Sequence, residues 1–203
     1  MRAARKIAAF TVAALPFAVF TVAVFVALAL SIAAPSDAAP SNRERRFYSA
    51  RAGVGLEAPP GWNLSAHTGY LNILCLLVHP SGSRISLAVD AAGTAQDAAA
   101  LAEQSRAGLV AQGIEITAVA PGPRGAVVVE ARVARRNQAL RQLYLVRAVE
   151  GNPSWRQAIV LTLTTTPADL AAAAGALDWV IARLDLETPV RTDDKQNHPD
   201  GGS

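Results

Sequence analysis

Several residue types are scarce in this chain of 203 residues, and each scarcity excludes something. There is one cysteine, Cys75, so no disulfide can form within the chain and the fold depends on its hydrophobic core. Lysine is absent from Arg43 to Glu187, where 14 arginines stand against 12 acidic residues. Because this positive balance is small, the sequence predicts no nucleic-acid partner.

Residues that carry chemistry are equally sparse. The three histidines are far apart and have no metal-ligand spacing, at His67, His79 and His198. There is no Gly-x-Ser-x-Gly elbow, no phosphate-binding Gly-Lys-Ser or Gly-Lys-Thr loop, and no dinucleotide fingerprint. Cys75 lies in the apolar run Tyr70–His79, which predicts a small buried hydrophobe. We therefore nominate no catalytic, cofactor-binding or metal-binding residue.

Charge is absent over one long stretch near the start. From Ile7 to Ser36 there are thirty residues without a charged side chain, preceded by Arg2, Arg5 and Lys6. As a helix these residues would span about 45 Å, against about 30 Å for the hydrocarbon core of a bilayer. We expect residues 7–34 to anchor the chain in the cytoplasmic membrane as one transmembrane helix, with the N-terminus inside.

A cleaved secretory signal is the alternative for this stretch. Ser36-Asp-Ala38 places small residues where a signal peptidase reads them, although the apolar region is about twice the usual length of about 7 to 15 residues. Both interpretations send the remainder across the membrane. We expect a bacterial inner-membrane protein with its domain on the periplasmic side, or a secreted protein if cleavage occurs near Ala38.

Composition divides the chain into three parts. Residues 1–42 form the predicted anchor or uncleaved signal with a linker rich in Ala, Pro and Ser, and residues 43–187 form one globular domain. Residues 188–203 are polar and lack periodicity, which predicts disorder.

The centre of the domain reads as a three-strand meander. The predicted strands are Gly125–Ala134, Leu140–Val149 and Trp155–Thr165. If each turn pairs the strands about its own centre, two rows align across them: Val129, Val146 and Ile159, and Ala131, Tyr144 and Leu161.

Other elements surround the meander. Ahead of it the sequence predicts an edge hairpin ending at Pro59-Pro60, strands at Tyr70–His79 and Arg84–Asp90, a helix from the capping box Thr94–Asp97 to Gly113, and a strand at Ile114–Ala120. After it, Thr166-Pro167 starts a last helix with the buried stripe Leu170, Ala174, Leu177, Ile181 and Leu184. The predicted class is α+β: an antiparallel sheet of about five to six strands plus the hairpin, with helices on its faces in an α-β-α sandwich.

Two features are candidates for partner contact. The less apolar face of the meander is predicted to carry Arg132, Arg141, Arg147 and Arg156, either as solvated or paired charges or as a partner patch. Trp179 lies off the buried stripe of the last helix. It either packs beneath a loop or the tail, or contacts a partner, since aromatic residues are enriched in interface cores.

The order of the predicted elements, together with several short motifs, resembles that of the PsbP-like superfamily, which includes the DcrB-type periplasmic proteins of bacteria. The resemblance covers roughly Arg45 to Leu186 and is carried by Phe47-Tyr48, Gly53-Val-Gly-Leu-Glu-Ala-Pro-Pro-Gly-Trp62, the helix after Thr94, and Thr166-Pro-Ala-Asp169. It implies an α-β-α sandwich and a binding or assembly role without catalysis. The acylated cysteine of the lipoprotein members is missing, which leaves anchoring to residues 7–34.

The expected function is therefore that of an extracytoplasmic, membrane-anchored, non-catalytic protein with a protein partner in the cell envelope. Two alternatives stay open at this point. One is a carrier that holds a small apolar ligand between sheet and helix, and the other is an enzyme with a cleft of convergent polar groups.

Overall fold

The computed structural model describes residues 45–66, 73–90, 96–149 and 152–187. The predicted anchor at residues 7–34 and the predicted disordered tail at residues 188–203 lie outside these ranges. Within them, no helix is both long enough and apolar enough to cross a bilayer.

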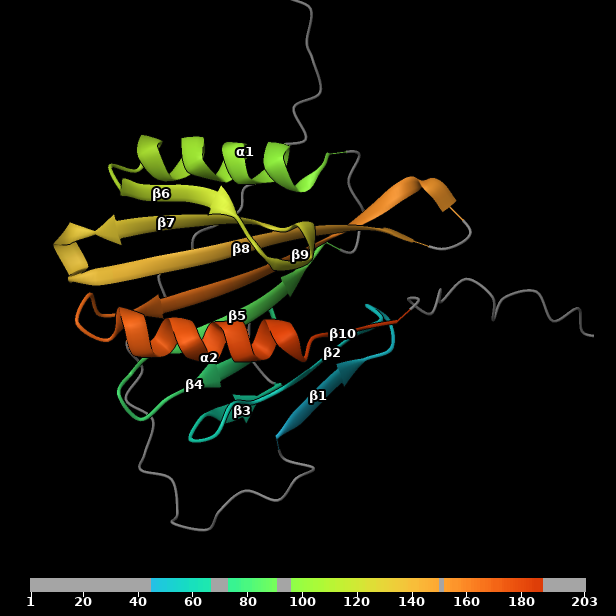
Figure 1. Cartoon of the computed structure of the whole chain (residues 1–203), viewed down its shortest axis with the longest axis horizontal. Coiled ribbons are helices and arrows are strands. Elements are labelled where there is room, and N and C mark those ends of the chain that lie inside the picture. The colour runs from blue at the N-terminus through green and yellow to red at the C-terminus, as the bar shows by residue number, and fades with distance from the viewer. Residues whose placement is uncertain (1–44, 67–72, 91–95, 150–151, 188–203) are drawn as a thin grey trace, which may run out of the picture. The chain divides into compact units, whose positions relative to one another are not determined.

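Two antiparallel sheets and two α-helices make up the described domain, which is of the α+β class (Figure 1). The smaller sheet has the order β1-β2-β10, and the larger has the order β3-β4-β5-β9-β8-β7-β6. The elements are β1 (Arg46–Ser49), β2 (Val54–Glu57), β3 (Asn63–Ser65), β4 (Ile73–Val78), β5 (Arg84–Val89), α1 (Ala98–Ala111), β6 (Glu115–Pro121), η1 (Pro123–Gly125), β7 (Val127–Val133), η2 (Ala134–Arg136), β8 (Gln138–Val149), β9 (Asn152–Thr165), α2 (Leu170–Ala182) and β10 (Asp185–Leu186).

The helices cover opposite faces of the larger sheet. Alternation along β8 sends Leu143 and Leu145 to one face and Gln142 and Tyr144 to the other. Leu143 and Leu145 belong to the core cluster that includes Leu177 of α2. Gln142 and Tyr144 contact α1 instead, through hydrogen bonds to its Ser105. The predicted packing of helices on the sheet faces is thus confirmed for α1 and α2.

The predicted register of the meander is wrong in both hairpins. Val129 pairs with Gln142 rather than Val146, because the turn at η2 is tight and Asn137 closes it with a φ of 49°. Between β8 and β9, Val146 pairs with Ala158 rather than Ile159, and the pairing shifts at a bulge between Ala148 and Val149. In the first hairpin the predicted partner is displaced by four residues, an even number, so each residue stays on its predicted sheet face. In the second the displacement is one residue, so the residues of β9 lie on the opposite faces from those predicted.

The core lies between the larger sheet and α2. Across the sheet, Cys75, Leu87, Leu161 and Leu143 follow one another in register, and each is at most 2% exposed. Burial raises the pKa of the Cys75 thiol to about 12, as expected of an inert small hydrophobe. Trp62 belongs to this core and is 6% exposed.

Both helices begin later than the sequence predicts. The N-cap of α1 is Asp97, whose carboxylate accepts from the Ala100 N–H at 2.8 Å, and Thr94 lies outside the described residues. The N-cap of α2 is Asp169, because Thr166 and the two residues after it form a turn. The buried residues of α2 are Ala173, Leu177, Val180 and Ile181, so only part of the predicted stripe is buried within the helix.

A buried polar junction joins the two sheets. The guanidinium of Arg147 on β8 donates from Nη2 to the carbonyls of Ala52 and Gly53, at 3.1 and 3.0 Å, and from Nε to Gln157 Oε1 at 2.7 Å. Gln157, on the neighbouring strand β9, donates to the Ala52 carbonyl at 2.8 Å and is 1% exposed. The turn between β1 and β2 is therefore held by two side chains of the larger sheet, which we call the Arg147–Gln157 junction.

Arg147→Met should lower the free energy of unfolding by about 2 to 3 kcal/mol, because it removes charge-assisted bonds and leaves buried carbonyls with fewer donors. Urea denaturation followed by circular dichroism measures this. Arg156→Met is the matched control, since Arg156 is exposed on β9 and faces the other way, and it should change stability by less than about 0.5 kcal/mol. Equal effects of the two variants would contradict the junction's role.

Candidate functional site

The four arginines predicted to share one sheet face are divided by the structure. Arg132, Arg141 and Arg147 project toward the face that α2 covers in part, as their register with one another requires. Arg156 pairs with Ala148 and projects from the opposite face. The separation follows from the one-residue difference between the predicted and the observed pairing of β8 with β9.

Arg141 connects three elements on the α2 side. Its Nε lies 3.6 Å from Glu130 Oε1 of β7, and its Nη2 lies 3.8 Å from Asp178 Oδ1 of α2. The arginine side chain is 23% exposed and the Asp178 side chain 57% exposed, so solvent screens the second pair more than the first. Nε is buried without a hydrogen-bond partner. Arg141 therefore carries a charge that its neighbours only partly satisfy.

Arg132 and Arg147 have different surroundings. Arg132 is exposed on β7, opposite Glu115 of β6. Arg147 forms the junction with Gln157, and burial lowers the pKa of its guanidinium without neutralising it. The bonds of Arg147 go to the β1–β2 turn, so its charge stabilises the domain itself. Arg141 presents its charge beside α2, and Arg132 is exposed on the same sheet face.

Trp179 lies on α2, partly buried against the core. The guanidinium carbon of Arg183, one helical turn later, lies 4.1 Å from the centroid of its ring. A cation at this distance over an indole face is attracted by the ring quadrupole. The surface of α2 at its C-terminal half therefore presents an aromatic ring with a cation stacked on it, next to the charged groups around Asp178.

A shallow hollow of about 360 Å³ lies beside the same half of α2. Its lining consists of Pro123, Arg124, Asp178, Ile181 and Ala182, and it is open to solvent. Within the core beneath, by contrast, Leu177 and Ile181 are 0% and 3% exposed against the sheet. The space in which a carrier would hold an apolar ligand is thus filled by side chains along this part of α2.

Arg124 closes the end of α2 from the η1 turn. Its Nη1 donates to the carbonyl of Leu184 at 2.8 Å, across sixty residues of sequence. To reach it, Arg124 adopts a φ of 59°, a left-handed conformation unusual for a residue with a Cβ. A cation bonded to a carbonyl at a helix C-terminus also meets the negative end of the helix dipole. Nothing in the sequence pattern singled out this residue.

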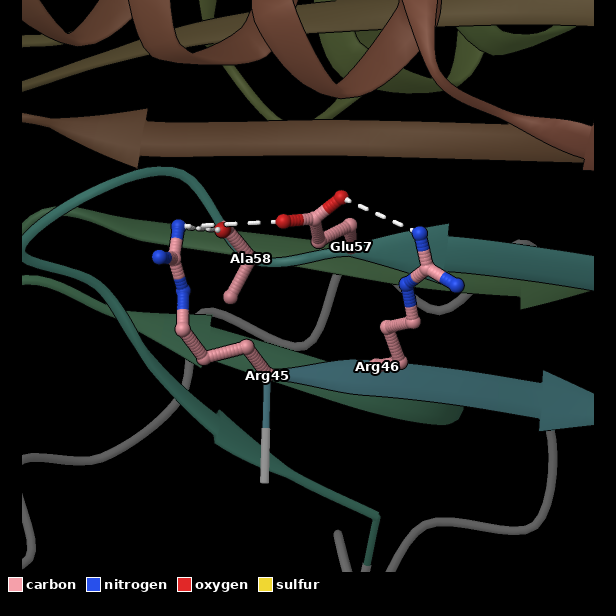
Figure 2. Close-up of polar contacts among 4 residues, drawn as sticks. All are labelled: Arg45, Arg46, Glu57 and Ala58. Atoms are coloured by element: carbon pink, nitrogen blue, oxygen red, sulfur yellow. Dashed lines mark hydrogen bonds and ion pairs between the residues drawn. The ribbon is translucent and has the colours of Figure 1, made fainter. Parts of the chain in front are cut away.

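The first residues of the described domain form a second polar cluster, which sequence patterns did not identify. Figure 2 shows Arg45 and Arg46 on either side of Glu57, at 4.0 and 3.9 Å from its carboxylate oxygens. Arg45 also donates from Nη2 to the Ala58 carbonyl at 2.7 Å. These contacts fasten the chain where the predicted linker meets the domain.

A buried hydrogen-bonded cluster also lies between α1 and β8. The Tyr144 hydroxyl bonds with Ser105 and lies 2.9 Å from Gln142 Oε1, and burial raises the pKa of Tyr144 to about 12. The cluster is closed on all sides, so it stabilises the contact of α1 with the sheet. In the part of the chain that the structure describes, no three His, Cys, Asp or Glu residues are grouped so that they could hold a metal ion.

Two solved structures are similar to this chain. One is the solution structure of cyanobacterial PsbP (CyanoP) from Synechocystis sp. PCC 6803, with 14% sequence identity and a TM-score of 0.47, covering 70% of this chain and 91% of that chain. The other is LpqN, described as involved in cell envelope biogenesis of Mycobacterium tuberculosis, with 13% identity and a TM-score of 0.49, covering 66% of this chain and 83% of that chain.

Neither structure indicates what this chain does, because identity is low and both TM-scores lie below 0.5. No protein-family model and no curated protein matches the sequence.

The capping role of Arg124 can be measured with two substitutions. Arg124→Ala should lower the free energy of unfolding by about 1 to 2 kcal/mol, because it removes the bond to Leu184 but keeps the left-handed φ. Arg124→Gly removes the same bond and tolerates that φ, so it should recover about 1 kcal/mol relative to alanine. Thermal unfolding of both variants tests this, and an alanine variant at least as stable as the glycine variant would contradict it.

Proposed function

We propose that this chain is a membrane-tethered, PsbP-like binding or assembly protein whose domain works outside the cytoplasm and performs no reaction. The observation that carries the proposal is the run of thirty uncharged residues from Ile7 to Ser36. Such a run is long enough to span a bilayer, and the basic residues before it favour an N-terminus on the cytoplasmic side. The described domain starts nine residues after this run, so a tethered domain stays close to the membrane surface.

The surface that best fits a protein partner is the C-terminal half of α2 with the adjoining strands. It combines the ring of Trp179, the incompletely bonded charge of Arg141 and the hollow beside Asp178. The exposed Arg132 projects from the same sheet face. Aromatic and arginine side chains dominate the energetics of protein interfaces, and a nearby hollow can receive a side chain of the partner.

The other two candidate arginines, Arg147 and Arg156, are not part of this proposed surface. Arg147 holds the β1–β2 turn, and Arg156 lies on the opposite sheet face. A cell-envelope protein is the expected partner, since it shares the compartment into which the anchor or signal would deliver the domain.

Fractionation tests the tether. Full-length protein should remain in membranes after extraction at alkaline pH, because a transmembrane helix resists treatments that release peripheral proteins. Protease added to spheroplasts should degrade the domain, whereas protease added to intact cells should not. Release of a full-length soluble protein into the cytoplasmic fraction would refute the proposal. A secreted product beginning near Ala39, read by N-terminal sequencing, would replace the anchor by a cleaved signal.

Site-directed photo-crosslinking tests the surface. A photoreactive amino acid at Ala182, which lines the hollow, should yield a discrete adduct with an envelope protein in intact cells. Ala107 is a matched control position, because it is an exposed alanine on α1, on the other side of the larger sheet. Adducts of equal yield at both positions, or at Ala107 alone, would show that the α2 surface is not the binding surface.

A further inference from the structure

β6 forms one edge of the larger sheet and pairs only with β7 among the described strands. Six of its seven residues are exposed, and Val119 at 50% is among the most exposed large hydrophobic residues of the described chain. There is no charged residue from Ile116 to Pro123. An uncharged, apolar edge strand is a template for pairing with another strand.

The hydrogen bonds of the β6–β7 pair show which groups of this edge face outward. The Gly122 N–H donates to the Ala126 carbonyl at 2.8 Å, so the backbone groups of Gly122 point toward β7. Because these directions alternate along a strand, Ala120 and Ala118 also point inward, and the N–H and carbonyl of Val119 point away from the sheet. Val119 therefore offers one donor and one acceptor to a further strand.

Both sides of Val119 limit what can pair there. Pro121 occupies the next outward position and has no N–H to donate, and the register shifts at a bulge between Ile116 and Ala118. The proline and the bulge both shorten the part of the edge that can pair with another strand. A long strand is thus disfavoured, while a short pairing centred on Val119 stays open.

We propose that this edge binds a second copy of the same chain, with β6 antiparallel to its counterpart about a two-fold axis through Val119. Each Val119 then donates its N–H to the carbonyl of the other Val119 and accepts a hydrogen bond from the other N–H. A symmetric pair therefore satisfies both outward backbone groups of Val119 without a third chain.

Charge and shape are compatible with this arrangement. The two-fold places Ala118 opposite Ala120, which are small enough to avoid a clash, and no residue from Ile116 to Pro123 is charged, so no like charges meet. The half-exposed Val119 side chains become cross-strand neighbours and are withdrawn from water. A hollow of about 380 Å³, lined only by uncharged residues from Val119 to Val127, adjoins the axis and requires no charged partner. Self-association through β6 does not depend on the proposed partner surface on α2.

Disulfide trapping in the full-length, membrane-bound protein tests the arrangement. Residues directly opposite in an antiparallel pair have Cα atoms about 5.5 Å apart or less, within the range of about 4.4 to 6.8 Å that a disulfide spans. Val119→Cys should therefore form a disulfide-linked dimer under mild oxidation. Wild-type protein should not, because its single cysteine, Cys75, is 0% exposed.

Asn63→Cys is the matched control, since Asn63 is exposed on β3, at the other edge of the same sheet. The Val119→Cys chain should yield several-fold more dimer than the Asn63→Cys chain at the same expression level. Comparable yields would mean random collision in the membrane and would overturn the proposal, as would an absence of dimer. Dimer loss on adding excess of another envelope protein would instead identify β6 as that protein's site.

A second variant removes the pairing without a cysteine. Val119→Pro deletes an N–H that the domain itself does not use, so the domain should keep its melting temperature within a few degrees while the particle mass in mild detergent falls from dimer to monomer. Ala120→Pro deletes an inward N–H and should unfold the edge. A Val119→Pro chain that is folded and still dimeric would overturn the proposal.

Discussion

The Arg147–Gln157 junction is the contact on which the two-sheet arrangement depends. The β1–β2 turn leaves the carbonyls of Ala52 and Gly53 pointing into the molecule, where backbone groups need partners. Arg147 and Gln157 supply them from adjacent strands, and the N–H of Glu187 adds a third donor to Gly53 at 2.8 Å. The first hairpin and the last strand of the domain thereby close on the same turn, beside the larger sheet.

The larger sheet separates two kinds of interior. On the α2 side, apolar residues of β4, β5, β7, β8 and β9 form one core cluster with the helix, and charge lies at its margin, where Arg141 meets Glu130 and Asp178. On the α1 side, small residues of the helix approach the strands closely, and Tyr144, Ser105 and Gln142 bond to one another. The consequence for function is that a partly satisfied charge, an aromatic ring and a hollow lie along α2, while the polar groups under α1 are enclosed.

A tether and a self-pairing edge would reinforce each other. Chains confined to one membrane meet at a higher effective concentration than chains in solution, so a short pairing about Val119 needs little intrinsic affinity. Pairing through β6 would leave α2 itself free, because α2 contacts β9, four strands from that edge counting β9 itself. A dimer of this kind would present two α2 surfaces at once, which suits an assembly role.

Local pattern determined much of this protein from sequence alone: the α+β class, the buried faces of the two helices in outline and the burial of Cys75. These follow from residue periodicity and backbone chemistry, which act over a few residues. The tertiary structure decided the register of β8 with β9, and with it the separation of Arg156 from Arg147, because a one-residue difference in register reverses the faces of a strand. It also decided the roles of Arg124 and Arg147, since their partners lie sixty or more residues away and only the packed fold brings them into contact.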